Sequence, residues 1–135
     1  MIQRNGEVVI KMLPNVQQIT IHPIILDTVQ SGSVIYTDEY DIYCRLPKLN
    51  MNYQHKTVNH GNGEYARDED GDGFHEVHVN TIEGFGSLLR SWLRPHRGVS
   101  QAKLPFYLGF FQFIHNVRAR GKRMLPSLIA LLVSA

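Results

Sequence analysis

The stretch EVHVNTIEGFGSLLRSWLR, residues 76–94, contains the change from strand to helix that decides the fold class. EVHVN (76–80) follows a run of turn-forming residues and is a candidate strand. Beyond it, at about 100° per residue, one face of a helix collects apolar side chains, which are Ile82, Phe85, Leu89, Trp92 and Leu93. We therefore predict a strand that leads directly into an amphipathic helix over 81–94.

A different face of this helix carries one acid and two arginines. Arg90 and Arg94 fall within about 20° of Glu83 around the helix axis. They follow Glu83 by seven and eleven residues, whereas a helical ion pair requires a spacing of three or four. Glu83 is thus free to bind a metal ion, and the arginines are free to bind phosphates. On periodicity alone, an ordinary amphipathic helix with a solvated polar face is the favoured interpretation.

Strands are predicted at three earlier positions. GEVVIKML (6–13) is the first, and HKTVNH (55–60) is the last before an acidic turn. Between them, the apolar run VIY (34–36) follows a Ser-Gly turn, as expected of a strand that is buried on both faces. This strand brings Asp38 to its carboxyl end.

Two further helices are predicted. Thr20, with Pro23 just inside, begins a short helix that ends near Gln30. A longer helix over 101–119 follows Ser100, a residue type that caps helix N-termini. It is apolar over most of its circumference, which predicts a buried packing helix. The alternation of strands and helices favours an α/β layer architecture.

Composition indicates one modest domain. The chain has 135 residues, of which 43% are apolar. Cys44 is the single cysteine, which excludes an internal disulfide and a cysteine-based zinc site and fits a reducing cytosol. MIQRNGEVVI (1–10) lacks the pattern of a signal peptide, and the apolar tail LPSLIALLVSA (125–135) is too short to span a bilayer. We expect the tail to be a packing helix or a frayed end.

Charge divides sharply along the chain. Residues 1–83 hold all twelve acidic and six of the basic residues, a net charge of −6. From residue 84 onward there are eight basic residues and no acid, a net charge of +8. Such an asymmetry indicates a polyanionic partner, most commonly nucleic acid, and a solvated basic helix is the alternative.

The turn RDEDGDG (67–73) begins like a calcium loop. The pattern D-x-[DN]-x-[DN]-G is met by Asp68, Asp70 and Asp72 followed by Gly73. Position 12, which requires a bidentate glutamate, falls on Val79. We interpret this segment as an acidic surface turn, with a calcium-binding module at the three aspartates as the weaker alternative.

Three segments carry a resemblance to a known family: VIYTDEYDIY (34–43), HKTVNHGNGEYARDEDGDG (55–73) and, above all, EVHVNTIEGF through NVRARGK (76–122). They resemble the C-terminal part of the catalytic domain of a bacterial insertion-sequence transposase of the DDE class. The resemblance implies an α/β fold, a ribonuclease H-like mixed sheet with flanking helices. It also implies a partial catalytic domain over 1–123, followed by the apolar tail 124–135.

The resemblance assigns roles to individual residues. Asp38 matches the second catalytic aspartate of the family, and Glu83 matches the third acid. The resemblance implies that both residues are metal ligands. Asn80 belongs to the same motif as Glu83, and in some relatives an asparagine takes the third catalytic position, so either residue is a candidate. Arg90 matches a basic residue that lies along the DNA, and Arg94 and Arg97 are expected to bind DNA with it. Residues 118–123 hold further basic candidates for phosphate binding.

The implied chemistry is transposition by metal-dependent phosphodiester hydrolysis and strand transfer. Two Mg²⁺ ions, for which Mn²⁺ substitutes, would act on the phosphodiester. Hard divalent ions prefer oxygen ligands, which agrees with a motif of Asp and Glu without cysteine. The implied partners are DNA, with a second copy or a full-length transposase, and no membrane. The implied location is the bacterial cytoplasm, in association with the nucleoid.

Two departures from the family pattern matter. Gly86 replaces the tryptophan that relatives usually carry, and glycine costs a helix about 1 kcal/mol against alanine. The first catalytic aspartate of the family lies on a central first strand, upstream of the segment that resembles IQRNGEVVI (2–10). We therefore expect a truncated, catalytically incomplete copy that lacks this strand and needs a carboxylate from elsewhere. The alternative is a non-catalytic remnant that binds DNA.

Overall fold

The computed structural model describes residues 1–134, which form two compact units. One unit is the continuous segment Leu13–Glu83, and the other joins Met1–Met12 to the residues from Gly84 onward. Each unit is described separately below.

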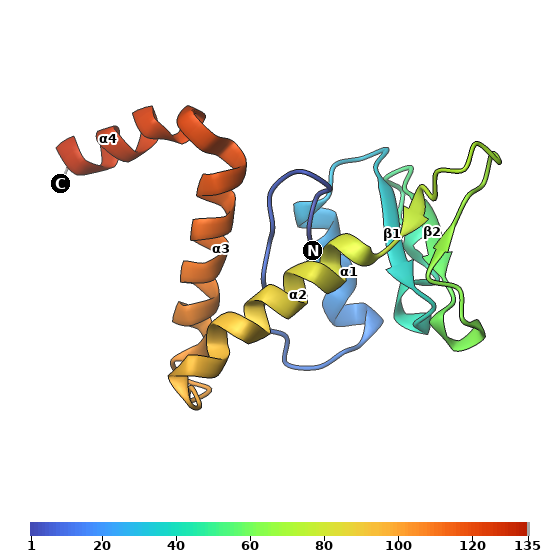
Figure 1. The fold of residues 1–135 in the computed structure, drawn as a ribbon, viewed down its shortest axis with the longest axis horizontal. Helices are drawn as coiled ribbons and strands as arrows, with labels where there is room; N and C mark the ends of the chain where they lie inside the picture. Colours follow the sequence, from blue (N-terminus) through green and yellow to red (C-terminus); the bar gives the residue numbers. More distant parts are fainter. Residues whose placement is uncertain (135) are drawn as a thin grey trace. The chain divides into compact units, whose positions relative to one another are not determined.

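The unit Leu13–Glu83 contains one helix and two small sheets (Figure 1). Helix α1 (Gln18–Thr28) precedes strands β1 (Val34–Asp38) and β2 (Gln54–Val58), which pair in parallel from Val34 opposite Gln54 to Asp38 opposite Val58. Short 3-10 turns at Asp41–Tyr43, Leu46–Lys48 and His60–Asn62 lie between and after them. Strands β3 (Ala66–Arg67) and β4 (Val77–His78) pair antiparallel, and helix α2 starts at Asn80.

Two apolar clusters hold this unit together. The larger joins α1 to the connection between β1 and β2, and its buried members are Ile21, Ile25, Ile42, Leu46 and Tyr53. The smaller joins β2 to β4 through Val58, Val77 and Val79, with Tyr36 of β1 packed against it. Because Val58 and Val77 are fully buried, the carboxyl end of β2 is packed into the core next to the end of β1.

Two details of this unit differ from the prediction. The run 34–36 is a strand as predicted, but it is not buried on both faces, because Val34 is 41% exposed and its neighbours are only partly covered. Among the described strands, β1 hydrogen-bonds only to β2, so one of its edges has no strand beside it. Helix α1 begins at Gln18, two residues earlier than predicted, and encloses Pro23 in its interior.

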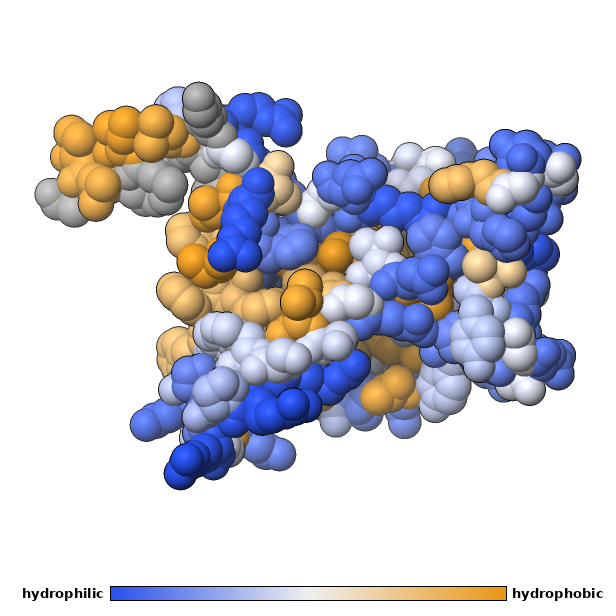
Figure 2. Space-filling view, in the orientation of Figure 1, coloured by the Kyte–Doolittle hydropathy of each residue, from blue (hydrophilic) through white to orange (hydrophobic). Residues whose placement is uncertain are grey.

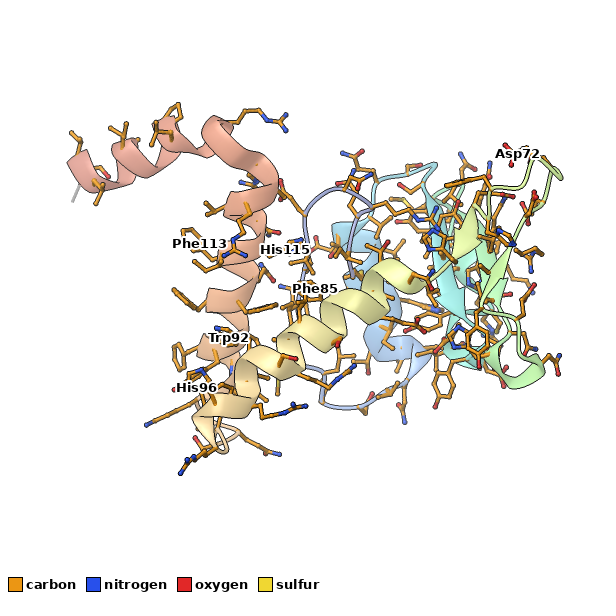
Figure 3. The ribbon with its side chains drawn as sticks, viewed as in Figure 1. Asp72, Phe85, Trp92, His96, Phe113 and His115 are labelled. Carbon is orange, nitrogen blue, oxygen red and sulfur yellow. The ribbon has the colours of Figure 1, made fainter. Side chains whose placement is uncertain are left out.

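The other unit is built from helices. It comprises the rest of α2 (Asn80–Leu93), α3 (Leu104–Arg120) and α4 (Leu125–Val133), with a 3-10 turn at Arg94–His96 and another at Gly121–Met124. Phe85 of α2 is buried, and the centroid of its ring lies 5.4 Å from the ring centroid of Phe111 and 5.0 Å from that of His115, both in α3 (Figure 3). The ring of Trp92, the last residue but one of α2, lies beside those of Tyr107, Phe110 and Phe111 of α3. The two predicted helices are thus confirmed, and aromatic side chains join them.

The segment 6–13 is not the strand that the sequence predicted. Residues 1–9 instead form a small hairpin with a single bridge between Ile2 and Val8. The outer edge of this hairpin is paired with side chains of α3: the Asn116 amide accepts from Val8 N–H at 2.7 Å and donates to Val8 C=O at 2.9 Å. Gln112 accepts from Ile10 N–H at 2.7 Å. Helix side chains therefore satisfy backbone groups that a neighbouring strand would otherwise satisfy.

Helix α3 is not the buried packing helix that its apolar residues predicted. None of its residues is fully buried, and Phe106 is 78% exposed. It begins after Lys103 and has no side-chain cap, so Ser100 is not its N-cap. Figure 2 shows apolar residues on the surface over α3 and α4. No helix among residues 1–134 is long and apolar enough to cross a bilayer.

Candidate active site

Asp38 lies at the carboxyl end of β1, as the sequence predicted. Its strand partner is the fully buried Val58 of β2, so the position of its backbone is fixed by the parallel ladder. Beyond the end of the strand lies an open hollow of about 310 Å³, which is lined by Asp38, Glu39, Tyr40, Asp41 and His60. Three carboxylates thus border one hollow beside a histidine. Ligands of open α/β sheets bind at this end of parallel strands.

Glu39 fixes the turn that follows β2. Its carboxylate accepts the backbone N–H of His60 at 3.0 Å and that of Gly61 at 3.1 Å. Hydrogen bonds from its own backbone N–H and from those of Gly61 and His60 hold the pKa of the Glu39 carboxyl below its ordinary value. The carboxylate is therefore ionised at neutral pH and holds the start of the turn.

The rest of the turn is held by its own side chains. The Asn59 side chain accepts from Asn62 N–H at 2.9 Å, and Glu64 accepts from Asn59 N–H at 2.9 Å. Gly63 adopts φ 75°, a conformation that favours glycine. Arg67 of β3 donates to Glu64 at 2.9 Å. The segment NHGNGEY is thus a rigid connection between β2 and β3.

His60 lies close to one predicted catalytic acid and lines a hollow with the other. Its Nδ1 lies 3.6 Å from Oε1 of Glu83, and His60 is also among the residues that line the hollow at the end of β1. Glu83 is in the first turn of α2, where its backbone N–H bonds to Val79 at 3.2 Å, and its side chain is 51% exposed. Asn80, the first residue of α2, is exposed to solvent. His60 thus lies beside Glu83 and lines the same hollow as Asp38.

The acidic turn is organised by hydrogen bonds to its own backbone. Asp68 accepts from Gly71 N–H at 2.7 Å and Gly73 N–H at 2.8 Å, and the Gly73 bond contributes most to the lowered pKa of Asp68. Ligand atoms of Asp68, Asp70 and Glu76 lie within 4.8 Å of one another. Asp72 is outside this cluster, in the loop between β3 and β4 (Figure 3). The predicted trio of aspartates is thus not the group that converges.

The predicted DNA-binding arginines lie in the other unit. Arg90, Arg94 and Arg97 are all exposed, and they take part in none of the ion pairs found among the described residues. Arg120, in contrast, donates two hydrogen bonds to Glu7, each of 2.5 Å. The side chain of Lys122, another basic candidate, lies outside the described residues. Three arginines near the end of α2 are thus available to an anionic partner, whereas Arg120 has an acidic partner within its unit.

Comparison with known proteins places the chain in a family. The profile of the ISXO2-like transposase domain matches residues 1–116. The chain belongs to this transposase family. A protein of Halobacterium salinarum described as "Uncharacterized protein in transposable element ISH50" is 39% identical over 107 residues, which are 78% of this chain and 34% of that protein. The chain thus spans about a third of that relative's length. No solved structure matches the chain.

In this member of the ISXO2-like transposase family, the match covers Asp38, Asn80 and Glu83 as well as the three arginines of α2 and the turn after it. It ends before Arg118, so the basic residues 118–123 lie beyond it. Sequence reasoning did not single out Glu39 or His60. The available signal was the length of the turn-forming segment around His60, which the structure explains as a set of mutually bonded side chains.

Proposed function

We propose that this chain forms part of the catalytic core of a DNA transposase that cuts and joins phosphodiesters with the help of divalent metal ions. The observation that carries this proposal is that, in a chain of the ISXO2-like transposase family, Asp38 borders a hollow that is also lined by His60, the histidine 3.6 Å from Glu83. We further propose that its unit Leu13–Glu83 is built on a ribonuclease H-like sheet. The parallel pairing of β1 with β2, and the position of Asp38 at the end of β1, support this fold.

The donor chemistry of the site fits a hard divalent cation. Asp38 and Glu83 supply carboxylate oxygens, the ligand type that Mg²⁺ and Mn²⁺ prefer. Both residues are exposed, and among the described residues only the His60 ring lies within ion-pair distance of Glu83. When bound, Mg²⁺ would neutralise charge on the phosphodiester and activate the attacking oxygen. Asn80, one turn before Glu83, offers an amide oxygen as an alternative third ligand.

The chain's own residues would bind and orient the DNA. Arg90, Arg94 and Arg97 present guanidinium groups that match phosphate oxygens in a bidentate way. The excess of basic residues from residue 84 onward would raise the affinity for DNA at low salt. These arginine–phosphate contacts do not depend on base sequence, and they would place a phosphodiester at Asp38 and Glu83.

A Mg²⁺-dependent nicking and strand-transfer assay on DNA that carries the ends of the element tests the proposal, performed both with this chain and with a version extended upstream to supply the family's first catalytic aspartate. We expect Asp38→Ala to reduce nicking by at least about 100-fold, since positioning and charge stabilisation supply most of phosphoryl-transfer catalysis. Asp27→Ala, at an exposed position of α1, is the matched control and should leave nicking unchanged. Nicking that survives Asp38→Ala would refute the assignment. If the protein binds the DNA but does not nick it, a non-catalytic DNA-binding role would be favoured.

A further inference from the structure

His60 has a position that the family assignment alone does not explain. It lines the hollow at Asp38, and its Nδ1 lies 3.6 Å from Oε1 of Glu83. Its other ring nitrogen, Nε2, is buried and has no hydrogen-bond partner among the described residues. Buried polar atoms are rarely left without a partner unless the site has a function.

The backbone around His60 is fixed by side chains on both sides. Glu39 accepts the N–H groups of His60 and Gly61 at 3.0 and 3.1 Å, and Asn59 caps the turn by accepting from Asn62 at 2.9 Å. A Cβ added to Gly61 would lie 3.3 Å from the side-chain oxygens of both Asn59 and Glu39. The turn therefore has little room to move, and the imidazole starts from a fixed Cα.

The His60 ring also has an aromatic neighbour. The centroid of the Tyr65 ring lies 5.3 Å from that of His60, with the two planes tilted by 45°. The His60 side chain is only 30% exposed, whereas Glu83, which it faces, is 51% exposed. The backbone of His60 is thus held by the fold, whereas Glu83 is the more exposed partner, at the start of a helix. We expect the more buried partner to orient the more exposed one.

We propose that His60 is a positioning residue that orients the Glu83 carboxylate toward the site at Asp38, and that Glu39 positions His60. This inference rests on the proposed function, in which Glu83 binds the metal ion. Partners of metal-binding carboxylates commonly change metal affinity by about 10- to 100-fold when they are removed. An exposed ion pair adds little to folding stability, so removal of His60 should change metal affinity far more than unfolding.

Site-specific Mg²⁺ titration tests the proposal. In the ¹⁵N-labelled full chain, which at 15.5 kDa suits NMR, the backbone amide shifts of Asp38 and Glu83 report the affinity of this site and ignore the acidic turn. We expect His60→Ala to weaken Mg²⁺ binding by about tenfold or more, and Glu39→Ala to weaken it in the same direction. His60→Asn should keep affinity within about twofold, because its amide nitrogen takes the place of Nδ1, whereas His60→Gln, whose nitrogen takes the place of Nε2, should not.

Three controls separate positioning from other effects. His75→Ala removes an exposed histidine from the acidic loop and should leave the affinity unchanged. Glu83→Gln should weaken binding, and adding His60→Ala to Glu83→Gln should weaken it no further, because both changes act through one carboxylate. If His60→Ala fails to fold, the contrast between His60→Asn and His60→Gln decides alone.

The outcomes separate the inference from the proposed function. Weaker binding in Glu83→Gln with wild-type binding in His60→Ala would overturn the positioning role and leave the metal site standing. Equal affinities for His60→Asn and His60→Gln would also overturn it. Unchanged binding in both Asp38→Ala and Glu83→Gln would refute the metal site itself, and the positioning role with it.

Discussion

Replacement of Asn116 by alanine should destabilise the helical unit more than is usual for a substitution at a partly buried position. The Asn116 amide makes two hydrogen bonds, of 2.7 and 2.9 Å, to the N–H and C=O groups of Val8. Val8 is only 1% exposed, so water has little access to these groups once the amide is gone. A buried backbone group left unpaired costs about 1–3 kcal/mol, so the loss of both bonds should cost about 2–6 kcal/mol.

A second substitution calibrates this estimate. Gln112 makes a single hydrogen bond of this kind, to Ile10, and Ile10 is only partly buried. Gln112→Ala should therefore cost about 1 kcal/mol, less than half of the Asn116 effect. Gln101→Ala, at an exposed position before α3, should change the free energy of unfolding by less than about 0.5 kcal/mol.

Urea unfolding followed by tryptophan fluorescence measures these differences. The single tryptophan, Trp92, lies in the same unit as Asn116 and stacks against α3, so its emission reports the unfolding of that unit. The midpoint should fall most for Asn116→Ala, less for Gln112→Ala and hardly at all for Gln101→Ala, with similar slopes. A loss for Asn116→Ala no greater than that for Gln101→Ala would show that the amide does not hold the hairpin.

Three other predictions concern a helix, a pH dependence and DNA affinity. Gly86→Ala should raise stability by up to about 1 kcal/mol in urea unfolding, because an added Cβ meets only the mobile Arg90 guanidinium at 3.5 Å, whereas Gly63→Ala should lower it because φ there is 75°. Because the pKa of Glu39 is lowered in the folded state, its ionised carboxylate should stabilise the turn above about pH 4.3, and this stabilisation should be lost as the pH falls further. The melting temperature of Glu39→Gln should therefore depend less on pH in this range than that of the wild type, and an unchanged pH profile would count against the hydrogen bonds of Glu39. In filter binding at several salt concentrations, Arg94→Ala should reduce the salt slope of DNA affinity by about 1, and Arg120→Ala, whose guanidinium is already held by a carboxylate, by less; equal slopes would contradict the assignment.

Local patterns predicted the elements of this chain well. The apolar stripe of 81–94 produced α2, and the apolar run at 34–36 produced β1 with Asp38 at its end. These patterns depend on neighbours within a few residues, which the sequence displays directly. The same patterns could not tell how deeply an element is buried. Helix α3 has the composition of a core helix, yet Phe106 remains 78% exposed.

Long-range pairing could not be predicted. Segment 6–13 has the composition of a strand, but it pairs with residues 1–3 in a small hairpin on one edge and with side-chain amides of α3, more than a hundred residues away, on the other. The site shows the same limit. Asp38 and Glu83 could be proposed from resemblance, whereas the roles of Glu39 and His60 depend on a turn whose hydrogen bonds are visible only in three dimensions. The turn-forming residues around His60 indicated a loop but did not indicate that its hydrogen bonds fix the position of His60.

Iron-mediated cleavage of the backbone tests most directly whether Asp38 and Glu83 share one metal ion. Fe²⁺ replaces Mg²⁺ at carboxylate sites, and with ascorbate and peroxide it generates radicals that cut the chain near the bound ion. We predict cuts near residues 38, 60 and 83 that Mg²⁺ suppresses and that Asp38→Ala removes. Cuts confined to residues 68–76, around the cluster of Asp68, Asp70 and Glu76, would contradict a shared site at Asp38 and Glu83.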